Sequence, residues 1–256
     1  MGFDLPPGVR QNGGVSNVFY APGGQRAAKV NDLFAAIARR YDLLNDLLSF
    51  GLHRLWKRRV VRLAGAGPGD RALDLCCGTG DIAFALARTG AETTGLDFSD
   101  KMLERAEARR RRMEQGGWKV PKFVQGDAER LPFPDQSFDA VTVGYGLRNL
   151  GSWEKGLEEM KRVARPGARL VVLDFGKPPN ALWRAAYFTH LKISVPLAGW
   201  LFCSNAQAYA YILESLKHYP AQSGVAEKMR ALQLSDVRVI GLLGGAMAIN
   251  YGRKPD

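Results

Sequence analysis

The chain has 256 residues, of which 46% are hydrophobic and 24% are charged. These shares are typical of globular proteins and exclude a disordered, collagen-like or low-complexity chain, and the length suits one α/β domain with an appendage. Lys and Arg number 36 against 25 Asp and Glu. The net charge of +11 predicts an anionic partner: a nucleic acid, an acidic membrane face or a charged substrate.

Cysteine and targeting signals are sparse. Cys76 and Cys77 are adjacent and Cys203 stands alone, so no spacing indicates a zinc site or a disulfide scaffold, and we expect no metal. The N-terminus has no apolar signal core, and no run reaches the roughly 18 apolar residues of a membrane span. The sequence therefore predicts a cytoplasmic protein that is soluble or peripheral to a membrane.

The N-terminal part divides into a tail and a helical cap. Residues 1–25 are rich in Gly and Pro and predict a flexible tail, whereas residues 26–256 are expected to form one domain. Apolar residues recur at helical spacing within 30–64, and Gly51 interrupts them. We therefore expect two helices joined by a bend ahead of a sheet.

Residues 70–176 carry the pattern of a parallel sheet. Short apolar strands are predicted at 72–76, 92–97, 122–125, 138–143 and 169–174, with helices at 80–88, 100–114 and 153–163. Regular alternation of strand and helix predicts an α/β, Rossmann-like, doubly wound sheet. A tight turn is expected at Pro166-Gly167.

A helical lid and two closing strands are expected after this core. Helical spacing covers 180–220, with breaks predicted near Pro196 and Ser204. Short strands at 237–240 and 247–251 fall within the closing segment 236–252.

The loop after the first predicted strand is the first candidate binding site. It reads Asp74-Leu75-Cys76-Cys77-Gly78-Thr79-Gly80-Asp81, and ligands of open α/β sheets bind beyond the carboxyl ends of the strands. Gly78 and Gly80 permit a tight turn and a close approach of the backbone to a ligand. The same glycines, with Asp97 at the end of the second strand, also satisfy the dinucleotide fingerprint.

Charge separates a dinucleotide from S-adenosylmethionine. A dinucleotide places its pyrophosphate at the helix N-terminus, where this chain has Asp81, while Asp74 ends the strand. Two carboxylates repel phosphate but suit an ammonium group, and S-adenosylmethionine has an ammonium, a sulfonium and no phosphate. Asp97 is then expected to accept hydrogen bonds from both ribose hydroxyls.

Asp127 and Ala128 follow the third predicted strand. We expect the side chain of Asp127 to accept from the adenine amino group and the backbone of Ala128 to contact a ring nitrogen. The alternative is that these aspartates are only helix caps and turn formers. Carboxylates at the ends of three successive strands argue against that alternative.

Four stretches of the chain resemble one enzyme family. They are 41–45 with 48–57, which includes Ser49-x-Gly51-x-His53-Arg54-x-Trp56-Lys57; 127–133; the run Tyr145-Gly146-Leu147-Arg148-Asn149; and 209–216 before Tyr219-Pro220. Over roughly 30–252 the chain resembles the C-methyltransferases of ubiquinone, menaquinone and phylloquinone biosynthesis, which belong to the class I enzymes that use S-adenosylmethionine.

The resemblance implies a seven-stranded sheet with N-terminal helices and a helical lid inserted before the last two strands. It implies S-adenosylmethionine as co-substrate and adds Thr79, Phe98 and Met102 to the expected cofactor-binding residues Asp74, Gly78, Gly80, Asp81, Asp97, Asp127 and Ala128. Gly144 departs from the family, since many relatives have a cofactor-contacting serine there.

The Cys76-Cys77 pair resembles the cyanobacterial and plastid branch, whose substrate is the phytylated naphthoquinone demethylphylloquinone. The resemblance therefore implies conversion of demethylphylloquinol to phylloquinol. The alternatives are a demethylmenaquinol or a ubiquinone precursor as acceptor.

The implied chemistry is methyl transfer to a ring carbon of a reduced quinol. Ionising the quinol hydroxyl makes the adjacent carbon nucleophilic, so the protein needs a group that stabilises the oxyanion and a route for the proton. Arg148 is expected to hold the oxyanion, because its guanidinium is a permanent cation with a fork of donors, and Asn149 to orient it. Tyr145 and His53 are candidates for proton movement. A structural salt bridge is the alternative for Arg148, and a structural hydrogen bond is the alternative for His53.

The lipid tail of such an acceptor has two expected consequences. Apolar residues of the lid are expected to line a tail channel: Trp183, Tyr187, Phe188, Leu191, Ile193 and Val195. Basic residues of the cap, among them Arg54, Lys57, Arg58 and Arg59, are expected to rest on the anionic cytoplasmic or thylakoid face of a membrane. A homodimer is compatible with the sequence.

Three other functions remain to be compared. An RNA methyltransferase fits the basic charge, but the chain has no NPPY-type motif, so we expect no nucleic-acid partner. A non-catalytic quinone-binding protein is disfavoured by the intact set of Asp74, Asp81 and Asp97. An NAD-dependent oxidoreductase is disfavoured by Asp81.

Overall fold

The computed structural model describes residues 46, 49, 51–203, 215, 216 and 219–256. The predicted tail 1–25 lies outside the described residues, and so does the first predicted helix of the cap except for Asp46 and Ser49. So do parts of the predicted lid, and the side chains of 194–203 are not described either.

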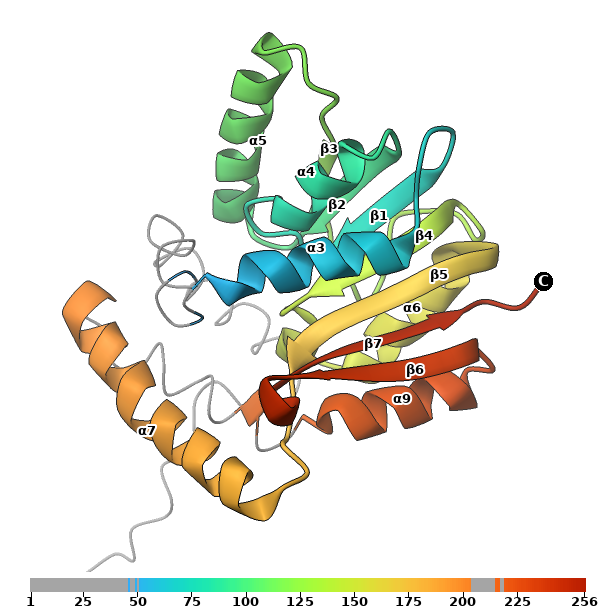
Figure 1. The fold of residues 1–256 in the computed structure, drawn as a ribbon. Coiled ribbons are helices and arrows are strands. Elements are labelled where there is room, and N and C mark those ends of the chain that lie inside the picture. The colour runs from blue at the N-terminus through green and yellow to red at the C-terminus, as the bar shows by residue number, and fades with distance from the viewer. Residues whose placement is uncertain (1–45, 47–48, 50, 204–214, 217–218) are drawn as a thin grey trace, which may run out of the picture.

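One sheet of seven strands organises the chain, in the order β3-β2-β1-β4-β5-β7-β6 (Figure 1). The parallel strands are β1 (Arg71–Leu75), β2 (Glu92–Asp97), β3 (Lys122–Gln125), β4 (Phe138–Gly144) and β5 (Ala164–Phe175). Strand β7 (Met247–Arg253) runs antiparallel between β5 and β6 (Ser235–Leu242). The predicted seven-stranded, Rossmann-like α/β class is confirmed.

Helices follow most strands and cover both faces of the sheet. They are α3 (Leu52–Ala64), α4 (Asp81–Ala87), α5 (Asp100–Gln115), α6 (Trp153–Val163), α7 (Ala181–Cys203) and α9 (Ala221–Ala231), with short 3₁₀ turns η2 (Leu147–Asn149) and η3 (Leu243–Gly245). Figure 1 shows α3 lying across the sheet and α7 extending away from it.

Alternate strand residues point into two separate cores. On one face Leu73, Val141 and Val172 pack against α6 and α9 through Met160 and Met229. On the other face Ala72, Ala140 and Val171 pack against α3 and α4, represented by Val60, Ile82 and Leu86. This burial on both faces explains the near-continuous apolar strands, because side chains alternate between the faces along each strand.

Two local predictions were wrong, and one helix was missed. The expected turn at Pro166-Gly167 is an irregular stretch within β5, where Gly167 adopts φ 77° and the register with β4 shifts. Helix α7 continues through Pro196, since a proline inside a helix removes one backbone hydrogen bond and does not have to end the helix. Helix α9 was not predicted, and it packs on the sheet through Val225 and Met229.

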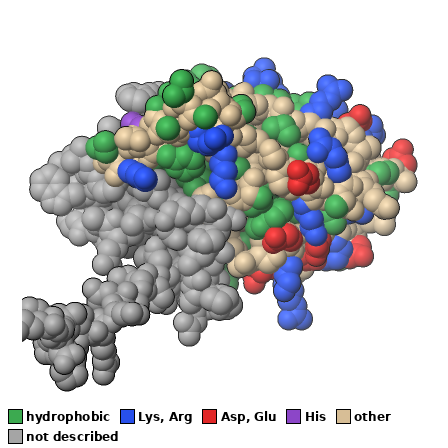
Figure 2. All heavy atoms as spheres, turned by 90° about the horizontal axis from the view of Figure 1, so that it is seen from below, with side chains coloured by type: hydrophobic (Ala, Val, Ile, Leu, Met, Phe, Trp, Pro, Cys, Tyr) green, Lys and Arg blue, Asp and Glu red, His purple; other side chains and the backbone are tan. Residues whose placement is uncertain are grey.

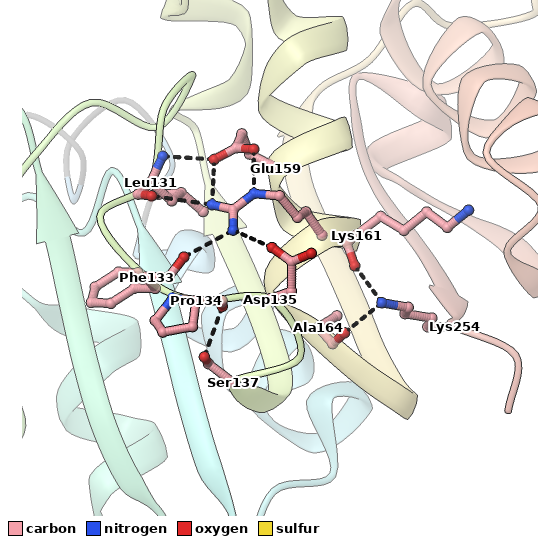
Figure 3. A network of polar contacts seen from close by, with 10 residues as sticks. Leu131, Phe133, Pro134, Asp135, Ser137, Glu159, Lys161, Ala164 and Lys254 are labelled. Atoms are coloured by element: carbon pink, nitrogen blue, oxygen red, sulfur yellow. Dashed lines mark hydrogen bonds and ion pairs between the residues drawn. The ribbon is translucent and has the colours of Figure 1, made fainter.

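Polar contacts fix the loop between β3 and β4 to helix α6 (Figure 3). Arg162 of α6 donates to the carboxylates of Glu159 and Asp135, and to the carbonyls of Leu131 and Phe133. Lys254 donates to the carbonyls of Lys161 and Ala164, which ties the C-terminal end to the same region (Figure 3). Arg162 and Lys254 therefore have structural roles away from the carboxyl ends of the parallel strands.

Within the described part of the chain, no helix is long and apolar enough to cross a membrane. Among the same residues, no group of three or more His, Cys, Asp or Glu side chains could hold a metal ion.

Candidate functional site

A pocket opens at the carboxyl ends of β1, β2 and β4 and encloses about 770 Å³, including the part open to solvent. We call it the main pocket. Its lining includes Gly78, Asp97, Phe98, Met102, Asp127, Ala128, Tyr145 and Asn149. The described residues that line it include three acids and no Lys or Arg. A protein of net charge +11 therefore presents a pocket that suits a cationic or neutral ligand and not a phosphate.

The loop after β1 owes its shape to left-handed backbone at several residues. Cys76 has φ 50°, Gly78 φ 56° and Gly80 φ 88°. A Cβ on Gly80 would lie 2.8 Å from the Phe123 ring, so both the conformation and the space at this position require glycine. Gly80 lines neither pocket, and its role is to form the turn into α4.

Asp97 connects this loop to the end of β2. Its Oδ2 accepts from the Gly78 backbone N–H at 2.7 Å and its Oδ1 accepts from the Ser99 N–H at 2.9 Å. Burial raises the pKa of Asp97, although these two amides act in the opposite direction. Each carboxylate oxygen keeps a second lone pair directed at new donors, so the predicted contact with two ribose hydroxyls fits the geometry.

Asp127 and Ala128, which were expected to contact adenine, line the main pocket together with Phe98 and Met102. Phe98 is 45% exposed, whereas Met102 and Ala128 are buried, and all three line the pocket. Asp127 Oδ1 accepts from the Glu129 N–H at 2.8 Å. The Asp127 side chain is thus both a turn former and a pocket wall, which combines the two predictions made for it.

A second, smaller pocket of about 340 Å³ lies further into the loop, and we call it the inner pocket. It is lined by Lys57, Asp74, Cys76, Cys77, Gly78, Thr79, Asp81, Ile82, Gly144 and Tyr145. Cys76, Gly78, Gly144 and Tyr145 line both pockets. The two pockets are therefore parts of one site, with Asp74, Thr79 and Asp81 at its inner end.

Asp74 is a buried carboxyl at the floor of the inner pocket. It is 1% exposed, and its Oδ1 accepts from the Thr142 hydroxyl at 2.8 Å. Burial raises its pKa to about 7, while the Thr142 hydrogen bond and Lys57 act in the opposite direction. A ligand ammonium binds the ionised form, so binding should couple to loss of this proton.

The affinity for S-adenosylmethionine is expected to fall as the pH drops below about 7, by up to tenfold per pH unit. The sign follows because an ammonium lowers the raised pKa of Asp74, so affinity is full above that pKa and lost below it. Calorimetry between pH 5.5 and 8.5 measures the profile. Asp74→Asn should be weaker and flat, and Glu92→Gln, exposed at the opposite end of β2, should keep the wild-type profile. A flat wild-type profile would exclude Asp74 as the ammonium site.

Asp81 is not an isolated carboxylate. Its Oδ2 lies 2.8 Å from Lys57 Nζ and its Oδ1 lies 2.5 Å from Arg109 Nη1. Burial would raise the pKa of Asp81, but these two cations outweigh it and hold the pKa well below its usual range. The prediction that Asp81 offers a free negative charge to an ammonium is corrected, because both of its oxygens already face cations.

Tyr145 and Asn149 reach the pocket wall as expected, but Arg148 does not. Arg148 is 6% exposed, and its Nη1 lies 2.7 Å from Asp174 Oδ1 in a pair that is buried on both sides. The same Nη1 donates to the carbonyl of Tyr145, whose φ is 63°. The structure therefore places Arg148 behind the wall, where it holds the backbone of Tyr145. This is the salt-bridge alternative, and it corrects the expectation that the guanidinium faces the acceptor.

His53 is also absent from both pocket linings. Its ring is buried in α3, with Nδ1 2.8 Å from the Ser49 hydroxyl and Nε2 3.7 Å from Asp46. Burial and the nearby Lys57 lower its pKa. The structural hydrogen bond, which was the alternative for His53, is what the structure shows.

Sequence reasoning missed several pocket residues, among them Lys57 and Ile82 of the inner pocket. Lys57 was grouped with the surface bases, although it shares the i, i+3, i+4 stripe of the buried residues His53, Val60 and Val61, and this spacing was the available signal. Ile82 was also missed. A Cβ on Gly144 would lie 2.6 Å from Ile82 Cδ1, so the Ile82 side chain occupies the space that a side chain at position 144 would need.

The chain is similar in sequence to a known family of enzymes. Residues 23–254 match the model of the ubiE/COQ5 methyltransferase family. The ubiquinone/menaquinone biosynthesis C-methyltransferase UbiE of Azotobacter vinelandii is 41% identical over 91% of this chain and 93% of its own. The demethylmenaquinone methyltransferase of Mycobacterium sp. (strain KMS) is 44% identical over 89% of this chain and 94% of its own.

Solved structures agree on the fold. A SAM-dependent methyltransferase of Thermotoga maritima has a TM-score of 0.61 at 20% identity and covers 87% of this chain and 99% of its own. The [4+2]-cyclase SpnF has a TM-score of 0.59 at 19% identity and covers 90% and 96%. At such identities the likeness shows the fold alone.

The family match and the relatives near 40% identity carry the assignment: the chain belongs to the ubiE/COQ5 methyltransferase family and is an S-adenosylmethionine-dependent C-methyltransferase of quinone biosynthesis.

Proposed function

We propose that this enzyme methylates a ring carbon of a reduced naphthoquinol that carries an isoprenoid tail. The observation that supports it best is that Tyr145 and Asn149 of the family run line the main pocket beside the loop after β1. Three of the similar relatives are named demethylmenaquinone methyltransferases, one from Desulfitobacterium hafniense and two from Mycobacterium strains. A naphthoquinol is therefore the acceptor class that we favour.

The described residues fit the cofactor. Asp97 offers lone pairs to the ribose hydroxyls and Asp74 offers a carboxylate to the ammonium. The absence of basic residues among those lining the main pocket suits a molecule without phosphate. When bound, S-adenosylmethionine supplies an electrophilic methyl group on a positive sulfonium.

The protein's part in the proposed reaction is to orient the acceptor beside the cofactor. Tyr145 lines both pockets, so it borders their junction, which is where we place the meeting point of acceptor and cofactor. Asn149 Nδ2 and Arg148 Nη1 both donate to the Tyr145 carbonyl, at 3.2 and 2.7 Å. Together they fix the left-handed backbone of Tyr145. We propose that Tyr145 and Asn149 position the quinol oxygen.

An anaerobic assay with labelled S-adenosylmethionine tests the acceptor class. Reduced demethylmenaquinol and demethylphylloquinol should accept the methyl group, and the oxidised quinones should not, because an oxidised ring carbon is electrophilic. A reduced ubiquinone precursor and tRNA serve as the competing acceptors. Methylation of either competitor, without methylation of the naphthoquinols, would reject the proposal.

The phytyl tail is the finer part of the proposal. It rests on Cys76-Cys77, and these cysteines line the inner pocket, where the cofactor end of the site lies. We propose that the enzyme prefers an acceptor with a phytyl tail. Direct competition between demethylphylloquinol and demethylmenaquinol measures this preference. A higher kcat/KM for the phytylated acceptor would support the phylloquinone assignment, and the reverse would assign the enzyme to menaquinone biosynthesis.

We propose further that the enzyme meets its lipid-tailed substrate at an anionic membrane face, on the cytoplasmic or thylakoid side. The structure does not favour the cap bases as a group: Lys57 lines the inner pocket and Arg54 pairs with Asp46. Arg58 and Arg59 are exposed.

Helix α7 offers a better contact, which we call the α7 surface. Leu182 is 84% and Ile193 64% exposed, and neighbouring Trp183 donates from Nε1 to the carbonyl of Leu243. The exposed bases Arg184 and Lys192 share this helix, whose sequence contains no acidic residue. Figure 2 shows hydrophobic and basic side chains side by side on this face. Exposed Trp183 and Ile193 also correct the expectation that they line an inner tail channel, whereas Tyr187 and Leu191 are buried.

Flotation with phosphatidylglycerol-containing vesicles should show salt-sensitive binding through the α7 surface. Each basic residue near an anionic surface contributes about 1 kcal/mol, so Arg184→Gln/Lys192→Gln should lower binding roughly 10-fold or more. Leu182→Ser/Ile193→Ser should lower it at every salt concentration. Trp118→Ser removes an exposed aromatic residue from the α5–β3 loop and is the control. Loss of binding only in Arg58→Gln/Arg59→Gln would move the contact to α3.

A further inference from the structure

Lys57 brings a positive charge into the inner pocket, where the other charged side chains are carboxylates. Its side chain is 13% exposed, and it lines the inner pocket with Asp74, Thr79 and Asp81. It comes from α3, whose neighbouring residues Val60 and Val61 are buried against the sheet. The ammonium is therefore held at the inner end of the site by a packed helix and not by a mobile surface chain.

The charges of the inner pocket match the amino-acid end of S-adenosylmethionine. That end carries one ammonium and one carboxylate. Asp74 is a carboxylate without a cation in hydrogen-bond contact among the described residues, and it suits the ammonium. Lys57 is the single basic residue among the described residues that line the inner pocket. A ligand carboxylate placed there therefore has Lys57 as its only charged side-chain donor.

The ion pair between Lys57 and Asp81 does not use all the hydrogen-bond donors of the Lys57 ammonium group. A lysine ammonium has three N–H donors, and one of them reaches Asp81 Oδ2. Asp81 Oδ1 is held independently by Arg109, whose guanidinium lies 4.5 Å above the Phe84 ring. Asp81 therefore positions Lys57 while keeping its own charge compensated from the other side.

We propose that Lys57 binds the α-carboxylate of S-adenosylmethionine, so that α3 recognises the cofactor and is not only a structural cap. The alternative is that Lys57 only pairs with Asp81 to hold α3 against α4. A third role, proton transfer to the acceptor, is not supported, because Lys57 does not line the main pocket. The proposal rests on the cofactor and not on the acceptor proposed above.

Calorimetry without acceptor or lipid tests it with three ligands. S-adenosylmethionine and S-adenosylhomocysteine carry the α-carboxylate, whereas decarboxylated S-adenosylmethionine keeps the sulfonium and an ammonium but lacks the carboxylate. Lys57→Met should weaken the first two by about 10- to 100-fold, the effect of one lost charge-assisted contact, and the third by less than about threefold. Lys57→Arg should retain part of the affinity.

Arg58→Met is the matched control, since it removes an exposed base from the next position of the same helix. It should leave all three affinities unchanged. Because Arg109 still pairs with Asp81 in Lys57→Met, we expect that variant to fold, and its melting temperature is measured alongside.

An equal loss for all three ligands would show that Lys57 acts through structure alone, and no loss for any would remove it from the site. Either result overturns the proposal. Normal binding by the wild type together with failure to methylate any naphthoquinol would reject the proposed acceptor and leave the role of Lys57 standing.

Discussion

Arg148→Ala is expected to lower the free energy of unfolding by about 3–5 kcal/mol, because it leaves a buried carboxylate without its cation. Asp174 is 3% exposed, and besides the Arg148 side chain it accepts from the Arg148 and Phe175 backbone amides. The variant also loses the stacking of the guanidinium over Phe175, at 4.5 Å. Thermal unfolding should show a fall in Tm of roughly 6–20 °C. A fall below 2 °C would mean that the pair contributes little to the fold.

The double variant Arg148→Met/Asp174→Asn separates the fold from the chemistry. It removes both charges, so most of the lost stability should return. If Arg148 only holds Tyr145, turnover should recover with stability. If the guanidinium acts on the oxyanion, turnover should stay about 10²–10³-fold low while S-adenosylmethionine binding is normal, and higher pH should help this variant more than the wild type. The geometry favours recovery, since Arg148 Nη1 is already shared between Asp174 and the Tyr145 carbonyl.

Asp97→Asn is expected to weaken S-adenosylmethionine binding by roughly 10- to 100-fold, because it replaces a charged acceptor of the ribose hydroxyls. Asp97→Ala should be worse, since it also leaves the buried amides of Gly78 and Ser99 without their acceptor and loosens the loop after β1. Calorimetry gives both affinities, and thermal unfolding shows that the fold survives.

Asp100→Asn is the control for Asp97, because Asp100 is an exposed acid three residues further on, in the first turn of α5. It should bind like the wild type. Unchanged affinity in Asp97→Asn would remove the ribose assignment and leave Asp97 as a loop-forming residue.

Several pocket residues could be predicted from the sequence because of their position at the ends of strands. Asp74, Gly78, Asp97 and Asp127 were found from sequence because each ends or follows a strand, and parallel strands bring their carboxyl ends to one edge of the sheet. Strand order along the chain is sufficient for that inference, and side-chain detail is not needed. The family resemblance added Phe98 and Met102, which also line the main pocket.

Helix α9 could not be predicted from its local sequence pattern. Its sequence contains Gly224, a weak helix former. In the structure, glycine at this position allows the close approach of Pro220, because a Cβ on residue 224 would lie 2.4 Å from the Pro220 side chain. Packing of Val225 and Met229 in the core stabilises a helix that intrinsic propensity does not favour.

The sequence by itself determined the fold class, the family and the edge of the sheet where the candidate site lies, because these depend on the order of strands and on motifs that are continuous in the chain. The partners of charged side chains were decided by tertiary structure. Lys57 turned inward to Asp81, and Arg148 was buried against Asp174, 26 residues away. The energy of a charge depends on its burial and on its nearest opposite charge, and both are set by packing between segments distant in sequence.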